Sequence, residues 1–390
     1  MAAVILGEDI NTGHGVTLDD QAREAGLYII GATRTGKTTL LERLAIHDMN
    51  EGHGLFFIDA HGDASQHLLE RVPSHRADGV IWLDVSDTEC PFGLNLFECP
   101  DLSNYNLVDR TASEVVQVFK KTWGPETNYG SWGPHLENFL RMIAYTLILN
   151  PPYTMLEILD LLTIESFRSQ LVSRIPEHYR VVRHFWNNDY PLIEREQRDY
   201  RSSTINKVYA FLTSQTLSHL VGQSESTIKF RPAMDSRKII LARLPLGEVG
   251  EDIVSLLGST MLSQILTAAL TRSDTPEDQR IPFYVYADEY QRFSTPALAT
   301  LFTETGKYRI RPTIAHQVRG KLDEASRETS LQTGSQIVFK IGSQDADELA
   351  ALFDTTPPPT EVVSYRHLPV PSLQPVTKLV HSPPTDQYAY

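Results

Sequence analysis

A glycine-rich segment at residues 31–38, Gly-Ala-Thr-Arg-Thr-Gly-Lys-Thr, matches the phosphate-binding pattern G-x-x-x-x-G-K-S/T at every position. Its glycines let successive backbone N–H groups turn inward around phosphate oxygens, and the helix that follows presents its positive end to the same anion. Lys37 is expected to reach the β- and γ-phosphates, and the Thr38 hydroxyl to bind Mg²⁺. ATP and Mg²⁺ are therefore the predicted cofactors. The predicted nucleotide-binding residues are Gly31, Ala32, Thr33, Arg34, Thr35, Gly36, Lys37, Thr38 and Thr39.

An acidic pair, Asp288 and Glu289, follows the apolar run 283–287. One carboxylate can enter the Mg²⁺ shell while the other polarises the attacking water, so the pair supplies what ATP hydrolysis needs. Asp288 is assigned to the metal and Glu289 to the base; a solvated pair of carboxylates at the end of a strand is the alternative. Gln317, which follows the run 313–315, is interpreted as a sensor of the γ-phosphate, or else as a polar residue that ends a strand.

These residues require a sheet that brings distant segments to one edge. The apolar runs at 55–58 and 80–83 are continuous, as expected for strands buried on both faces of a parallel sheet. The predicted strands are residues 27–30, 55–58, 80–83, 238–242, 283–287, 313–315 and 336–339. Besides a helix directly after the glycine-rich segment, helical spacing predicts helices at residues 108–121, 136–149, 154–162, 178–187, 205–220 and 252–272.

The order of these elements predicts an α/β fold: a P-loop core with a mostly parallel sheet flanked by helices, interrupted by an all-helical insertion. Residues 1–100 are assigned to the first part of the core and 101–235 to the insertion. Residues 236–354 form the second part of the core, with the acidic pair and the sensor. Residues 355–390 are rich in proline and are predicted to form an extended tail.

Composition narrows the choice of function. The 390-residue chain has a formal net charge of −14, which excludes a generally basic nucleic-acid coat protein. Cys90 and Cys99 form no Cys-x-x-Cys pair, so a disulfide framework or a cysteine zinc site is not expected. The first residues do not resemble a signal peptide, and the longest apolar run identified, 142–149, is too short to span a bilayer. We predict a cytoplasmic protein without a membrane span, which only partners would recruit to the inner face of a membrane.

Several segments, in this order, resemble the HerA/FtsK superfamily and, more narrowly, its coupling-protein branch in type IV secretion. They are the glycine-rich segment and residues 57–63, 132–134, 238–250, 288–291 and 313–317, with the helical insertion between them. The resemblance covers residues 6–353. It implies a RecA-like core, a hexameric ring and ATP-driven movement of DNA through that ring, without dependence on DNA sequence. It also implies a secretion-channel or relaxase partner, or a nuclease partner in the HerA-like case.

The chain departs from this family in three places. Coupling proteins usually begin with transmembrane helices, whereas this sequence starts almost directly at the core, and they usually end in a longer extension. The family also often carries an arginine in the helix after the acidic pair, as a finger that reaches the neighbouring subunit. Here glycine, Gly306, takes that place in the run 305–309. Arg309 is therefore our assignment for a catalytic arginine, beside Lys37; Arg311 and Arg272 are the alternatives.

Weaker patterns have competing interpretations. His47, His53, His61 and His67 lack the i, i+4 spacing of two helical ligands, so a histidine metal site is not favoured. His61 is interpreted as a residue near the nucleotide or as one that stabilises a turn. The basic run Arg195, Arg198, Arg201 and Lys207 alternates with acidic residues, which favours a salt-bridged solvated face over a DNA contact. The segment 120–123, Lys-Lys-Thr-Trp, offers a base-stacking tryptophan or, more commonly, one half-buried at a helix end.

The leading hypothesis is a ring-forming ATPase that translocates DNA. A viral genome-packaging ATPase or a HerA-like helicase is the alternative within the superfamily. A nucleotide-gated adaptor that docks a substrate without moving DNA is the alternative from another class. Because the chain is acidic, the leading hypothesis requires that DNA-contacting charges be few in each subunit and concentrated by ring symmetry around a pore.

Overall fold

The computed structural model describes residues 3–9, 13–124, 132–192, 198–299 and 306–353. Its centre is a seven-stranded sheet with the strand order β5-β6-β4-β7-β8-β3-β9, in which every neighbouring pair is parallel. All seven predicted strands are confirmed, and β8 is longer than expected. The strands are β3 (Leu27–Ile30), β4 (Gly54–Asp59), β5 (Val80–Asp84), β6 (Ile239–Arg243), β7 (Phe283–Ala287), β8 (Ile310–His316) and β9 (Ser335–Val338).

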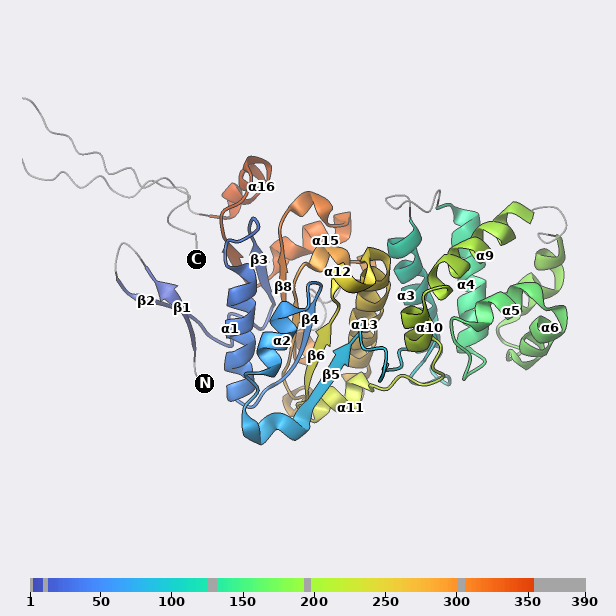
Figure 1. Ribbon diagram of the computed structural model, residues 1–390, viewed down its shortest axis with the longest axis horizontal. Helices are drawn as coiled ribbons and strands as arrows, with labels where there is room; N and C mark the ends of the chain where they lie inside the picture. Colours follow the sequence, from blue (N-terminus) through green and yellow to red (C-terminus); the bar gives the residue numbers. More distant parts are fainter. Residues whose placement is uncertain (1–2, 10–12, 125–131, 193–197, 300–305, 354–390) are drawn as a thin grey trace, which may run out of the picture.

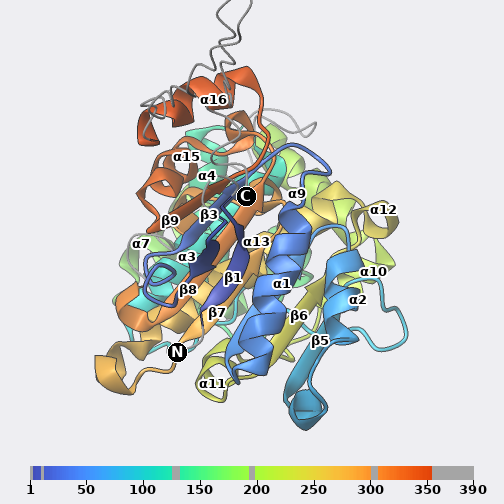
Figure 2. The same cartoon turned by 90° about the vertical axis from the view of Figure 1, so that its left-hand side faces the viewer.

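Both faces of this sheet are covered, which explains why its strands lack an apolar-polar alternation. In β4, Leu55 and Phe57 pack toward α1 (Lys37–Asn50) and α2 (Asp63–Leu69). Figure 2 shows these two helices side by side in front of the sheet. The alternate residues Phe56 and Ile58 belong to the larger core on the other face, with α11 (Phe230–Asp235) and α13 (Glu251–Thr271).

The described elements between β5 and α11 are all helices, and most of them form the lobe that extends away from the sheet in Figure 1. The predicted helix 205–220 is in fact two, because Ser214 caps a new helix by accepting a hydrogen bond from the backbone N–H of Leu217. One further helix, α6, was missed. The helices are α3 (Tyr105–Trp123), α4 (Pro134–Ile148), α5 (Glu157–Thr163), α6 (Glu165–Arg174), α7 (Arg180–His184, continued by a π-helical turn), α9 (Arg198–Leu212) and α10 (Gln215–Val221).

The limits assigned to the domains stay a prediction. Within the range assigned to the insertion, α11 packs beneath the sheet, with the ring of Phe230 against that of Phe56. Outside the central sheet, β1 (Val4–Glu8) and β2 (Gly15–Leu18) form a small antiparallel hairpin that was not predicted. The remaining α-helices are α12 (Leu246–Val249), α15 (Glu324–Thr329) and α16 (Ser343–Leu349). The predicted tail, 355–390, lies outside the described residues.

The prediction that 142–149 is the longest apolar stretch is wrong, because α13 lies in a longer one. Among the described residues, the helical segment Glu251–Asp274 is long and apolar enough to cross a bilayer, but 83% of its apolar window is buried inside the protein. It is a core helix that lies between the sheet and α3. Serines, threonines and a glycine interrupt its apolar residues, so no uninterrupted run marks it in the sequence.

One side of α13 holds the turn that follows β7. The Ser259 hydroxyl donates to the carbonyl of Phe293, and the Ser255 hydroxyl donates to the carbonyl of Arg292. A Cβ atom at Gly258 would collide with the buried ring of Phe293. Small residues at these positions therefore let α13 approach the segment that carries the acidic pair.

Replacing Gly258 by Ala should destabilise the protein, although alanine favours a helix by about 1 kcal/mol over glycine. The clash with Phe293 should cost about 1–3 kcal/mol of the free energy of unfolding, measured by chemical denaturation. Gly247→Ala is the matched control, because Gly247 lies in α12 with nothing within 4 Å of the added Cβ. In a Phe293→Ala background the penalty at 258 should disappear; a penalty that persists there would contradict this packing.

Candidate active site

The glycine-rich loop lies at the carboxyl end of β3, between the ends of β8 and β9. The Gly31 N–H donates to the carbonyl of His316, and the Ala32 N–H donates to that of Lys340. Gly31 is required here, because a Cβ atom would come within 2.5 Å of the Cβ of Phe339. Arg34 and Gly36 have left-handed backbone angles, with φ of 64° and 105°. The loop is thus turned by its backbone and held by both neighbouring strands.

The start of α1 provides groups suited to an anion. No side chain caps this helix, so the N–H groups of its first turn are not capped by the protein itself. Lys37 is 5% exposed, and its Nζ lies 3.0 Å from the carbonyl oxygen of Ala32, across the loop. Burial lowers the pKa of Lys37, while attraction to Glu289 and Asp288 opposes that shift. This combination of N–H donors, helix dipole and lysine fits a polyphosphate.

The hydroxyl of Thr38 donates to Oδ2 of Asp288 over 2.6 Å, although the two residues are 250 positions apart. Asp288 directly follows β7 and is 2% exposed. Burial raises its pKa to about 6; repulsion from Asp59 and Glu289 adds to the shift, whereas the Thr38 hydrogen bond opposes it. A hydroxyl and a carboxylate oxygen at this distance are ligands that Mg²⁺ accepts, and a bound cation would favour the ionised form of Asp288.

Glu289 lies next to the loop in a left-handed conformation, with φ of 52°. Its carboxylate accepts hydrogen bonds from the side-chain amides of Gln317, at 2.6 Å, and Gln291. The carbonyl oxygen of the Gln317 side chain accepts in turn from the Thr33 hydroxyl at 3.2 Å. The structure therefore brings Glu289, Gln317 and the glycine-rich loop together. Gln291 was missed as a member of this group, although it stands two residues after the acidic pair.

Two further residues near this edge have structural partners. Asp59, at the end of β4, accepts from the backbone N–H groups of His61, Ala64 and Ser65 and so fixes the turn into α2. This supports a turn role for the backbone of His61. His316, at the end of β8, is completely buried and lies 2.7 Å from the hydroxyl of Tyr28. Burial lowers its pKa to about 3, so the imidazole is neutral.

The arginine candidates lie away from the loop of their own chain. Arg272 is fully buried and forms an ion pair with Asp235 at 2.9 Å. Arg311 is 5% exposed and donates to the hydroxyl of Tyr284. Arg309 immediately precedes β8, at the edge of the sheet opposite the glycine-rich loop, and is partly exposed. The structure thus commits Arg272 and Arg311 to contacts within the chain, while the role of Arg309 stays a prediction.

The basic and aromatic patterns of the helical region turn inward in the described part of the chain. Trp123 is buried and stacks on Phe119, with ring centroids 4.5 Å apart, so the base-stacking interpretation is wrong. Lys207 is 6% exposed, and Arg201 donates to the carbonyl of Leu162. The predicted solvated or DNA-facing position is therefore wrong for Lys207, whereas Arg201 is partly exposed. Arg195 and the side chain of Arg198 lie outside the described residues.

Comparison with known proteins extends these observations. No protein-family model matches the chain. Its sequence is 20% identical over 396 residues to the type 4 coupling protein DotL of Legionella pneumophila; the match covers 86% of this chain and 49% of DotL. The chain thus spans about half the length of this curated relative.

Solved structures of coupling proteins and of VirB4 have a similar fold. The conjugative coupling protein TrwB, in a crystal form with sulphate, matches with a TM-score of 0.58 and 18% identity over 86% of this chain and 75% of that one. VirB4 of Thermoanaerobacter pseudethanolicus matches with a TM-score of 0.57 and 13% identity over 90% and 88%. TrwB with ADP and Mg²⁺ matches with a TM-score of 0.55 and 19% identity over 81% and 70%.

These findings agree with the motifs. The sheet and its flanking helices correspond to the RecA-like core of TrwB, so the predicted fold class is confirmed. The predicted resemblance is confirmed as well: the chain is similar in sequence to the type 4 coupling protein DotL, and in fold to the conjugative coupling protein TrwB and to VirB4.

Proposed function

We propose that this chain is an ATPase that uses MgATP at residues 31–39 to translocate DNA as a ring, in the manner of a conjugative coupling protein. The observation that carries the proposal is the hydrogen bond between Thr38 and Asp288, with Glu289 beside it at the same edge of the sheet. It joins the phosphate loop to a buried carboxylate, which is the arrangement a Mg²⁺-nucleotide needs. TrwB, which has the same fold, has been solved with ADP and Mg²⁺.

The site residues divide the chemistry among them. Lys37 and the first N–H groups of α1 would hold the β- and γ-phosphates, and Thr38 and Asp288 would hold the Mg²⁺. When bound, MgATP supplies the phosphoryl group that water attacks. Glu289 would orient and deprotonate that water, because Gln317 and Gln291 hold its carboxylate in place beside the loop. Gln317 also contacts Thr33 of the loop, so it would sense the γ-phosphate.

The proposed ring and partners rest on the resemblance to coupling proteins. DotL and TrwB are named as coupling proteins, TrwB of bacterial conjugation. We therefore propose a hexameric ring that receives DNA from a relaxase and passes it to a secretion channel. The net charge of −14 means that few cations per subunit would hold the DNA, through its phosphates. Arg309 would complete the site of the neighbouring subunit, since it lies far from the loop of its own chain.

Lys37→Ala should abolish ATP binding, whereas Glu289→Gln should bind ATP and fail to hydrolyse it. The lysine holds the phosphates, while the glutamate acts on water; loss of a general base costs about 10²–10⁴-fold in rate. Equilibrium binding of a fluorescent ATP analogue and steady-state phosphate release separate the two effects. Lys321→Ala, at an exposed position, is the control. Undiminished turnover in Glu289→Gln would show that another group is the base.

DNA should stimulate ATP hydrolysis at low salt, and the stimulation should fall steeply as salt rises, because phosphate contacts release counterions. ATPase rates with single-stranded and double-stranded DNA, between about 50 and 200 mM salt, test this. A rate that does not respond to either DNA would contradict the proposal. Displacement of a triplex strand then separates a translocase from a docking adaptor, which would displace none.

Mixing two inactive variants tests the role of Arg309 across subunits. Arg309→Ala retains the phosphate loop, and Lys37→Ala retains the arginine. If Arg309 acts on the neighbouring subunit, mixed rings contain some complete sites and should regain part of the ATPase activity. An Arg309→Ala protein that is fully active alone, or mixtures with no gain over either variant, would contradict a role between subunits.

A further inference from the structure

A second concave site lies away from the nucleotide edge, between α3, α11 and the C-terminal half of α13. This cavity has a volume of about 910 Å³, within the range of small-molecule sites. Its apolar wall includes Leu107, Val118 and Ile228. Since α11 and the end of α13 lead into the amino ends of β6 and β7, the cavity lies on the opposite side of the core from the phosphate loop. The residues proposed to bind the nucleotide do not line it.

The cavity contains a carboxyl group that the protein satisfies only in part. Glu114 of α3 is 6% exposed, and its Oε2 accepts from the hydroxyl of Thr267 at 2.8 Å. Its Oε1 is buried without a hydrogen-bond partner; the Arg110 guanidinium is 4.0 Å away, which is too far for a hydrogen bond. The hydroxyl of Ser263, on the α13 wall, is also buried without a partner. Unsatisfied groups of this kind are costly in a folded protein, and a ligand in the cavity could satisfy both of these.

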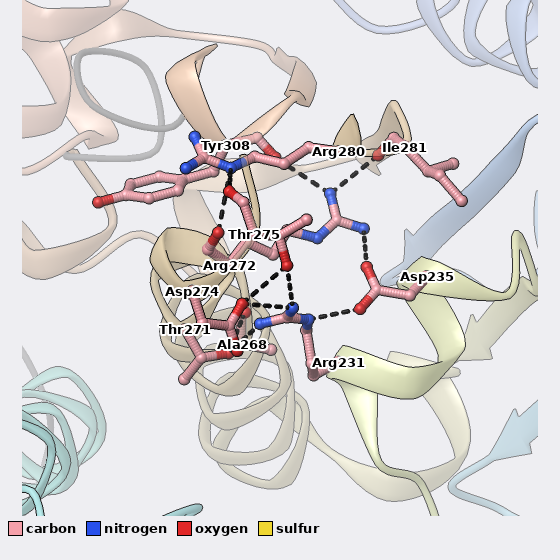
Figure 3. A network of polar contacts seen from close by, with 10 residues as sticks. All are labelled: Arg231, Asp235, Ala268, Thr271, Arg272, Asp274, Thr275, Arg280, Ile281 and Tyr308. Atoms are coloured by element: carbon pink, nitrogen blue, oxygen red, sulfur yellow. Dashed lines mark hydrogen bonds and ion pairs between the residues drawn. The ribbon is translucent and has the colours of Figure 1, made fainter. Parts of the chain in front are cut away.

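The other charges of the wall already have partners. Figure 3 shows one side of this wall, where Arg231 lies between Asp235 and Asp274, and Asp235 also pairs with Arg272. At another part of the wall, Lys229 pairs with Glu98. The lining acids are Glu98, Asp101, Glu114, Asp235 and Asp274, and the lining bases are Lys229 and Arg231. Three of these acids, Glu98, Asp235 and Asp274, are therefore already paired with cations. Oε1 of Glu114 lacks a hydrogen-bond donor, so a cationic group that donates hydrogen bonds suits this part of the wall.

We propose that this cavity binds a small organic amine, with its ammonium group on the carboxylate of Glu114 and its apolar body between α3 and α13. The Ser263 hydroxyl, with its free lone pairs, would accept a second hydrogen bond from the ammonium. This site is independent of the proposed ATPase, since it shares no residue with the nucleotide site and needs no ATP to be measured.

Three indole probes of the same shape but different charge test the proposal on the full chain at pH 8. They are tryptamine, a cation; tryptophol, its neutral alcohol analogue; and indole-3-acetate, an anion. Isothermal titration calorimetry should show tryptamine bound at least about tenfold more tightly than tryptophol, as a charge-assisted hydrogen bond to a carboxylate predicts. Indole-3-acetate should be the weakest of the three.

Glu114→Gln keeps the shape of the side chain and an acceptor for Thr267, and should reduce the preference for tryptamine over tryptophol to about twofold or less. Glu70→Gln, at the exposed position directly after α2, is the matched control and should leave the preference unchanged. Ser263→Leu would fill the cavity from the other wall and should weaken both probes. This variant tests the site even if the change at 114 impairs folding.

The dependence on pH gives a readout that the wild-type chain supplies alone. Burial raises the pKa of Glu114 to about 8, so the free carboxyl is mostly protonated at pH 7. Burial also raises the pKa of Cys99, the thiol in the wall, which favours its uncharged form. An alkylammonium remains charged up to about pH 10. Binding of tryptamine should therefore release a proton at pH 7, and its affinity should rise about tenfold between pH 7 and 9.

Several results of these experiments would overturn the proposed amine site. Equal affinity for tryptamine and tryptophol, no measurable binding of tryptamine, or a preference that survives Glu114→Gln would overturn the proposal. An affinity for tryptamine that does not rise with pH would overturn it as well. Any of these results would leave Glu114 as a neutral buried acid without a ligand, and would not affect the proposed ATPase.

Discussion

The hydrogen bond from Thr38 to Asp288 is the contact on which the candidate active site depends. It closes over 2.6 Å between the first turn of α1 and the end of β7, and it requires the carboxyl ends of parallel strands to meet at one edge of the sheet. Glu289 and Gln317 reach the same place because β8 lies between β7 and β3. Burial makes the contact sensitive: Asp288 is almost fully enclosed and has a raised pKa, so a cation is the natural partner for its charge.

Much of this edge of the sheet was predictable, because buried strands and a phosphate loop both restrict which residues can stand at each position. Strands covered on both faces must be apolar throughout, so β4 and β7 were visible as continuous runs, and a phosphate loop is constrained at fixed positions. The hairpin of β1 and β2 and the short helix α6 were missed, since few of their residues are buried. Gln317 and Gln291 lie in segments that the motifs identify. Their contacts with Glu289 could not be predicted, because side-chain amides leave no periodic pattern in a sequence.

The burial of basic and aromatic residues in the helical region, such as Lys207 and Trp123, could not be predicted from the sequence for a different reason. A lysine such as Lys207 has the same composition signal whether its charge faces water or its stem is buried. Glu114 is the opposite case, a charged residue at a helical core position whose burial only the packing of α3 on α13 reveals. Motifs therefore predict the nucleotide edge of the sheet. The cavity on the other side depends on helix packing, which the motifs do not show.

The close approach of Gly258 to Phe293 also determines which residue of α13 faces this ring. A shift of the helix by one residue would place Leu257 or Ser259 under the ring, and neither leaves the space that glycine leaves. Gly258 is therefore fixed opposite Phe293, whereas the 3₁₀ turns between α13 and β7 face solvent at several residues. Insertions in this part of the chain should therefore be tolerated in the connection between α13 and β7, where an added residue can bulge outward without moving the acidic pair.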